Sequence, residues 1–193
     1  MKLTIDDIAD QRAYEREREA FRAHIIELKQ HRRIGVGPFV SLVFENRDTI
    51  RFQIQEMARA ERILTDDGIQ AELDIYNPLI PEKGSLSATL FIELTSKDEL
   101  MEWLPKLVGI ERAVQLRIDG DVVAATPDAE HERQLTRETI TASVHYVHFD
   151  LEPAQIERFA DARVRIEVAH ENYAYDTELS KAARESLLDD LRG

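Results

Sequence analysis

The sequence contains no cysteine. This absence excludes disulfide bonds, iron–sulfur clusters, cysteine-ligated zinc and catalysis by a thiol, so a redox role would need a partner or a cofactor. Glycine and proline are also scarce, with 7 and 6 copies, whereas hydrophobic residues make up 43% and charged residues 33% of the chain. This composition is typical of a folded globular protein. The 193 residues suit one domain that buries about 70% of its unfolded surface.

Long apolar runs and positive charge are lacking as well. No apolar run of about 18 residues occurs, and the N-terminus is charged from the start, so we expect a cytoplasmic protein that does not enter a membrane. The chain has 25 Lys and Arg against 38 Asp and Glu, which gives a formal charge of −13. This charge repels phosphate backbones and predicts no nucleic-acid partner. The alternating charges of residues 12–33 indicate a solvated helix face or, alternatively, a docking surface for an acidic partner.

Helical and strand patterns alternate without a regular βαβ rhythm. They predict an α+β fold, a single domain over 1–193 with a mixed or mostly antiparallel sheet packed with several helices. Asp119-Gly120 predicts a hairpin, and the polar run 126–139 predicts a long connection or an exposed helix. We expect helices at about 4–30, from 48 onward, and at 65–76, 96–109, 152–161 and 177–191, and strands at 39–45, 85–94, 112–119, 141–151 and 163–169.

The expected C-terminal helix, about 177–191, carries one apolar stripe. Leu179, Ala183, Leu187 and Leu191 share a face of a segment that is otherwise charged. Such a stripe packs either on its own domain or on a partner chain. We expect packing on its own domain.

Five segments spread over most of the chain carry a resemblance to a known family: "FENRDTIRFQIQEMARAERI" (44–63), "YNPLIP" (76–81), "VGIE" (108–111), "SVHY" (143–146) and "HENYAY" (170–175). Together they resemble one bacterial family, domain of unknown function 3501. The resemblance covers the full length and implies no activity, cofactor or catalytic residue. Genes of that family lie near rubrerythrin-like and heterodisulfide-reductase-like proteins, which implies an association with redox or oxidative-stress metabolism and a redox protein as partner.

Polar residues of the helix expected after Asp48 raise a question about their partners. At about 100° per residue, Gln53, Glu56 and Glu61 fall within an apolar arc, whereas Gln55 falls on the wet side. A buried polar group without a partner costs about 1–3 kcal/mol. We therefore expect a structural network, in which Glu56 or Glu61 pairs with an arginine of a strand and Gln53 bonds to the backbone.

The alternative is a polar pocket. In that case Gln53, Glu56 and Glu61 line a small cavity together with His145 or His170, and a carboxylate near a histidine could serve general acid–base catalysis on a small molecule. This enzyme hypothesis requires the side chains to converge. The favoured hypothesis, an accessory or binding protein, does not.

The histidines do not predict a metal site. His145 and His148 are three apart in an expected strand and should point to opposite faces. Glu167 and His170 form a Glu-x-x-His motif, but they lie in a strand, whereas di-iron bundles need two such motifs on helices. The segment 35–37 precedes a strand and so is no phosphate loop. We predict neither a metal ion nor another cofactor.

Overall fold

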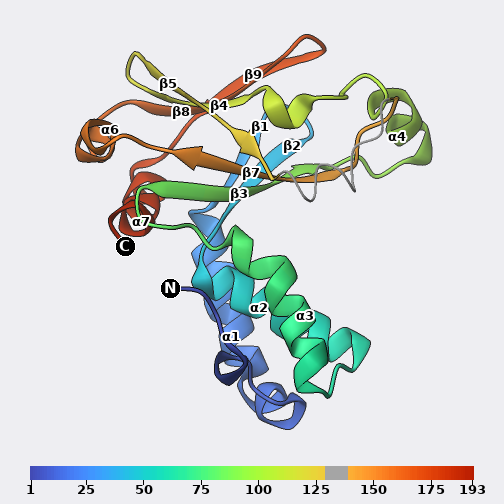
Figure 1. Cartoon of the computed structure of the whole chain (residues 1–193). Helices are drawn as coiled ribbons and strands as arrows, with labels where there is room; N and C mark the ends of the chain where they lie inside the picture. Colours follow the sequence, from blue (N-terminus) through green and yellow to red (C-terminus); the bar gives the residue numbers. More distant parts are fainter. Residues whose placement is uncertain (129–138) are drawn as a thin grey trace.

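The computed structural model describes residues 1–128 and 139–193, so the expected connection or helix at 126–139 lies largely outside the described residues. The described strands form two sheets, and every pairing in them is antiparallel (Figure 1). Sheet A has the order β1-β2-β3-β7-β6 and sheet B the order β5-β4-β8-β9. The strands are β1 (Arg33–Val36), β2 (Val40–Glu45), β3 (Ser85–Ile92), β4 (Val114–Ile118), β5 (Asp121–Ala124), β6 (Thr126–Pro127), β7 (Val144–Asp150), β8 (Val164–His170) and β9 (Tyr173–Glu178).

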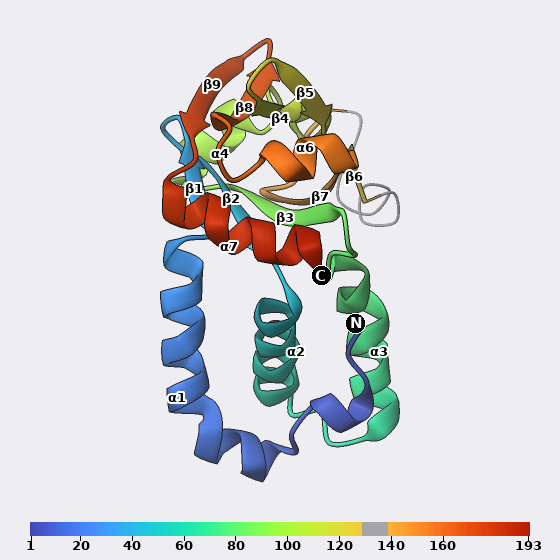
Figure 2. The same ribbon diagram turned by 90° about the vertical axis from the view of Figure 1, so that its left-hand side faces the viewer.

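The helices divide between two places. Figure 2 shows three of them side by side on the side of sheet A away from sheet B, where they form a helical layer, and α7 along β3. The three helices of this layer are α1 (Gln11–Gln30), α2 (Arg47–Glu61) and α3 (Asp66–Tyr76), and the helices around the sheets are α4 (Lys97–Trp103), α6 (Pro153–Arg158) and α7 (Lys181–Arg192). Short 3-10 turns occur at η1 (Ile5–Asp7), η2 (Asn77–Leu79) and η3 (Ile110–Arg112). The α+β class is confirmed.

The main core lies between the two sheets. Strands with a period of two place one set of side chains on each face, and β4 and β8 bury every second residue. The inward set of sheet A, for example Leu42, Leu90 and Phe149, packs with the inward set of sheet B in one apolar cluster. Sheet A is therefore largely apolar on the face toward sheet B, where the buried His145 is an exception.

Polar contacts join the helices of the helical layer in addition to apolar ones. Its apolar cluster around Ile54 and Leu73 is small. Arg18 of α1 makes a two-pronged ion pair with Glu56 of α2, at 2.8 Å from each carboxylate oxygen. Further pairs join Glu17 to Arg51, Glu15 to Arg59 and Asp7 to Arg47. Some of the alternating charges of residues 12–33 thus bind α2 instead of only facing solvent.

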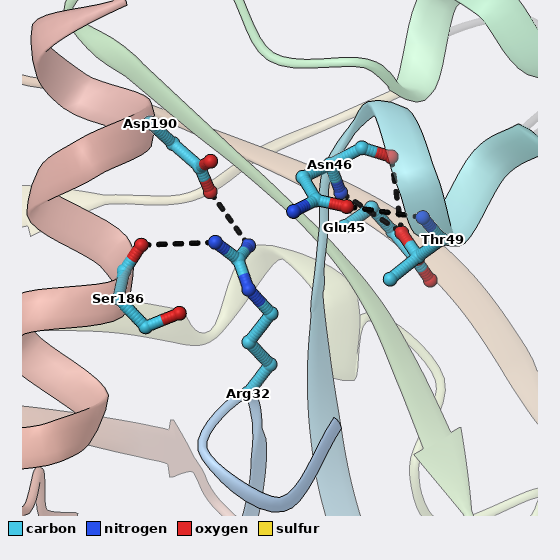
Figure 3. A network of polar contacts seen from close by, with 6 residues as sticks. All are labelled: Arg32, Glu45, Asn46, Thr49, Ser186 and Asp190. Carbon is cyan, nitrogen blue, oxygen red and sulfur yellow. Dashed lines mark hydrogen bonds and ion pairs between the residues drawn. The ribbon is translucent and has the colours of Figure 1, made fainter. Parts of the chain in front are cut away.

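A buried ion pair ties the α1–β1 junction to α7. Arg32, which is 2% exposed, donates to Asp190 Oδ2 at 2.6 Å and to the carbonyl oxygen of Ser186 at 2.9 Å (Figure 3). Burial raises the pKa of Asp190, although Arg32 acts in the opposite direction. The stripe Leu179, Ala183, Leu187 and Leu191 is buried in the core of its own domain, as expected.

Three expectations about the fold need correction. The C-terminal helix begins at Lys181 and not at 177, because Thr177 and Glu178 pair with β8 as the end of β9. Strand β9 itself was not expected. The strands form two sheets instead of one. Separately, no helix in the described part of the chain is long and apolar enough to cross a membrane.

Candidate functional site

The face of sheet A toward the helical layer carries a patch of polar side chains. Glu45, Ser87 and His148 are direct neighbours across β2, β3 and β7, and Thr89 and Tyr146 form the next row. Their strand neighbours Phe44, Ala88 and Val147 point into the apolar core. The strict alternation of β7 therefore sends Tyr146 and His148 to the helical side and His145 to the other side.

Glu45 is the buried charge of this face. It ends β2, immediately before the cap of α2, and is 8% exposed. Its two carboxylate oxygens accept hydrogen bonds of 2.6 Å each from the hydroxyl groups of Thr49 and Thr89. Thr49 is fixed in turn because it forms the capping box of α2 with Asn46 (Figure 3). No ion pair of Glu45 occurs within the described residues.

A cavity of about 240 Å³ opens above Glu45, between the helical layer and sheet A. Polar and apolar groups from α1, β2, α2, α3, β3, β7 and the end of η2 line it. The polar ones are Lys29, Glu45, Thr49, Gln53, Tyr76, Thr89 and Tyr146, and the apolar ones are Ile50, Leu79, Phe91 and Val144. The volume suits a small molecule, below the about 300–1,000 Å³ of sites for drug-sized ligands.

The electrostatic environment of this cavity is negative around its two phenols. Burial, together with the nearby Tyr76, Glu45 and Asp128, raises the pKa of Tyr146 to about 12. Burial also raises the pKa of Tyr76, with Glu72 adding to the rise and a hydrogen bond from Gln53 opposing it. Both phenols therefore stay protonated at neutral pH and can donate hydrogen bonds to a ligand or accept them from one.

Two groups next to the cavity complete the polar face. Ser87 is 1% exposed, and its hydroxyl oxygen has no hydrogen-bond partner among the residues that the structure describes. Burial lowers the pKa of His148, although Asp128 and Asp150 counteract the effect. His148 Nε2 lies 3.8 Å from Asp128 Oδ2. Burial thus favours the neutral form of His148 at the edge of the polar patch.

A second cavity, of about 150 Å³, lies at the far end of the helical layer between η1, α1 and α2. Its buried polar groups already have partners. Gln55 bonds to the backbone of Ala9, and Tyr14 donates to Glu56 at 2.7 Å. We therefore take the cavity above Glu45 as the candidate site.

Comparison with known families and structures gives a clear assignment. The profile of the family described as protein of unknown function (DUF3501) matches residues 2–191. The chain belongs to this family. It is also similar to a crystal structure of a novel protein of unknown function from Burkholderia pseudomallei K96243, with 37% sequence identity and a TM-score of 0.91. The similarity covers 99% of this chain and 100% of that one. A comparison with curated proteins finds no match.

In this DUF3501 member the residues proposed for a pocket do not converge. Gln53 lines the cavity above Glu45, whereas Glu56 pairs with α1 and Glu61 is exposed. His145 lies on the other face of sheet A, 3% exposed, with its Nε2 2.9 Å from the oxygens of Thr141 and Ala142. His170 ends β8, and its Nε2 lies 3.1 Å from the Val108 carbonyl oxygen. Gln53, Glu56 and Glu61 therefore do not meet either histidine, and the carboxylate beside His145 is the buried Glu111, whose Oε2 lies 3.9 Å from His145 Nδ1.

The helical phase expected for α2 was wrong at three positions. Gln53 and Glu61 are exposed, whereas Gln55, expected on the wet side, is only 2% exposed. Gln55 accepts a hydrogen bond from Ala9 N at 2.8 Å and donates one to Ala9 O at 3.1 Å. The chain before α1 covers this side of α2, so the buried arc is rotated toward Gln55.

A structural network of the expected kind exists, with different members. Glu56, one of the carboxylates expected on the buried side of the helix, does have an arginine partner. This partner, Arg18, belongs to a helix and not to a strand. The Arg18 and Tyr14 hydrogen bonds lower the pKa of Glu56 to about 2 against the effect of burial. The backbone contact expected of Gln53 is made by Gln55.

Sequence reasoning missed Glu45, Thr49, Thr89 and Tyr146. One signal was present, because "FVSLVFE" ends an apolar strand on a carboxylate directly before a helix cap. As for metal ions, no group of three or more His, Cys, Asp or Glu side chains in the described residues could hold one. The absence of a metal and of other cofactors stays a prediction.

Proposed function

We propose that this protein binds a small polar molecule in the cavity between the helical layer and sheet A. One observation carries the proposal: a carboxylate that is 8% exposed, Glu45, is held in place by two hydroxyl groups at the cavity wall. Burying a charge is costly unless it is paired and hydrogen-bonded. A site that keeps such a charge next to an open cavity is typical of ligand recognition, where stability is lost in favour of function.

The surrounding side chains support a binding role over a catalytic one. The cavity offers hydroxyl, phenol and amide groups that can orient a ligand, whereas its carboxylate is already engaged by Thr49 and Thr89. The histidine nearest in the sheet, His148, lies two strands away from Glu45. At about 4.8 Å per strand this places their backbones roughly 10 Å apart. Glu45 and His148 therefore do not form a contacting acid–base pair.

The test is to ask whether a small molecule purifies with the protein. Protein from its native cells would be denatured and the released compounds identified by mass spectrometry. Val144→Trp should abolish the released compound, because Val144 lines the cavity and a larger side chain there would fill it. Val122→Trp is the matched control, since Val122 is 47% exposed on β5. Equal release from all three proteins, or release from none, would contradict the proposal.

The cellular role that we propose is that of a cytoplasmic accessory protein of redox metabolism. This rests on the family resemblance alone. Because the chain has no cysteine, it would hold or deliver a small molecule beside a redox protein instead of passing electrons through thiols or an iron–sulfur cluster. A pull-down from native cells should enrich a redox protein in a way that survives washing at moderate salt. A partner set without any redox protein would remove this part of the proposal.

A further inference from the structure

The cavity above Glu45 is lined by charged side chains, and these bear on the charge of a molecule that could bind there. Glu45 supplies one negative charge from sheet A, and Lys29 supplies one positive charge from α1. Lys29 is half-exposed, and no carboxylate of the described residues lies within ion-pair distance of its ammonium group. The cavity thus presents two opposite charges that do not satisfy each other.

Glu45 has room for a cationic ligand. An ionised carboxylate has about four acceptor positions, and the hydroxyl groups of Thr49 and Thr89 occupy two of them. A hydroxyl hydrogen bond orients the carboxylate but does not neutralise it. An ammonium group would add both a counter-charge and up to three donors, and charge-assisted bonds of this type are about twice as strong as neutral ones.

The other walls of the cavity also favour a positive charge on the part of the ligand that lies near Glu45. Tyr76 and Tyr146 supply aromatic rings to the cavity, and such rings attract cations through their faces, whereas the Phe91 ring already has the Arg33 guanidinium over it. Glu45, Asp128, Glu61 and Glu72 all act on the two phenols as negative charges. A ligand that carried only negative charge would be repelled from this end.

From this arrangement we propose that the ligand is a small zwitterion of the amino-acid type. Its ammonium group binds Glu45 among the aromatic rings, and its carboxylate binds Lys29 and the Gln53 amide at the exposed side of the cavity. This inference rests on the proposed function, because it names the charge pattern of the molecule that the cavity binds. Both charges of the cavity then gain a partner on binding.

The experiment is calorimetric titration of the purified protein with each of the twenty common amino acids. At least one should bind. Its N-acetyl derivative, which has lost the cation, and its decarboxylated amine, which has lost the anion, should each bind at least about tenfold more weakly, the size expected for one charge-assisted bond. No binding by any amino acid, or equal binding of the N-acetyl derivative, would overturn the inference.

Two variants assign the charges to residues. Glu45→Gln should weaken binding of the amino acid at least about tenfold. Because that change lies in a buried network, Lys29→Gln at the exposed side of the cavity provides the test that does not depend on it. In Lys29→Gln the amino acid and its decarboxylated amine should bind equally, since the partner of the carboxylate is gone. Lys97→Gln, an exposed lysine on α4, should leave both affinities unchanged.

The outcomes separate this inference from the proposed function. If native protein releases a neutral or purely anionic molecule that Val144→Trp fails to hold, the cavity binds a ligand but the zwitterion is wrong. If nothing is released and no amino acid binds, both are wrong. If the amino acid and its amine still differ in Lys29→Gln, the carboxylate is not bound by Lys29 and the zwitterion assignment is overturned.

Discussion

The two sides of sheet A are stabilised in different ways. Toward sheet B the contact is a continuous apolar cluster that includes side chains with no exposed surface, such as Leu42, Phe44 and Leu90. Toward the helical layer the apolar cluster is small, and Glu45, Thr49 and Thr89 form a hydrogen-bonded group at a cavity wall. Close packing of apolar side chains leaves few voids larger than a water molecule. The comparison indicates that the sandwich supplies most of the apolar packing, whereas the helical side contains the cavity in which we propose that a ligand binds.

The largest effect on stability should come from replacing a buried leucine by alanine on either side of sheet A. Leu90→Ala, in the sandwich, should lower the free energy of unfolding by about 2–5 kcal/mol. Leu73→Ala, in the small helical cluster, should fall at the lower end of that range, because fewer rigid neighbours surround the space it leaves. Chemical denaturation measures both. Leu64→Ala, at 74% exposure, is the control and should change little. A larger loss for Leu73 than for Leu90 would reverse the comparison.

A smaller effect is expected where the helical layer depends on a polar contact. Gln55→Ala should cost about 1–3 kcal/mol, because it leaves the amide and carbonyl groups of Ala9 without their partner. Gln53→Ala is the matched control on the same helix and should cost less than about 0.5 kcal/mol. Thermal or chemical denaturation of the two variants measures both losses of stability. Equal losses would show that α2 is oriented differently from the arrangement described.

The ion pair between α1 and α2 should make stability depend on pH. Folding lowers the pKa of Glu56 from 4.5 to about 2, so the folded state favours the charged form. The stabilisation is complete above about pH 4.5 and is lost as the pH falls toward about 2. Glu56→Gln should therefore be less stable than wild type at neutral pH, and the difference should shrink within this window. A difference that stays constant from pH 6 to pH 2 would exclude this linkage.

The smallest effect should come from an exposed ion pair of the same interface. Arg59 and Glu15 are 2.5 Å apart, with side chains 39% and 44% exposed. Such a pair contributes about 0.2–1 kcal/mol, and salt screens it. Arg59→Ala should thus cause a slight loss at low salt that disappears near 1 M salt. A loss that persists at high salt would mean that the arginine stem contributes by packing.

Much of the fold could be predicted because its signals are local. The alternation in β7 and the Asp119-Gly120 turn between β4 and β5 each follow from a few neighbouring residues. Strand β9 was missed because it is an exposed edge strand, and Tyr173 is the buried residue in a run that otherwise faces solvent. Its pattern shows no apolar alternation for sequence reasoning to detect.

The candidate site could not be predicted because no single segment contains it. Glu45, Gln53, Tyr76 and Tyr146 come from four elements, and only the packing of the helical layer on sheet A brings them together. A helix wheel assumes one buried side, whereas α2 is contacted by α1, by α3 and by the chain before α1. The burial of Gln55 depends on Ala9, which lies 46 positions earlier. Local periodicity carries no information about such contacts.

The order in which the chain visits the two sheets has a consequence for its folding. Strands β1 to β3 belong to sheet A, β4 and β5 to sheet B, β6 and β7 again to sheet A, and β8 and β9 to sheet B. Neither sheet can be completed before the other has begun, and α7 closes the core only at the end of the chain. Long-range strand pairing of this type slows folding, because the chain loses the entropy of closing long loops before the stabilising strand contacts can form. The sandwich should therefore form in one cooperative step, late in synthesis, and no fragment that ends before β8 should retain its core.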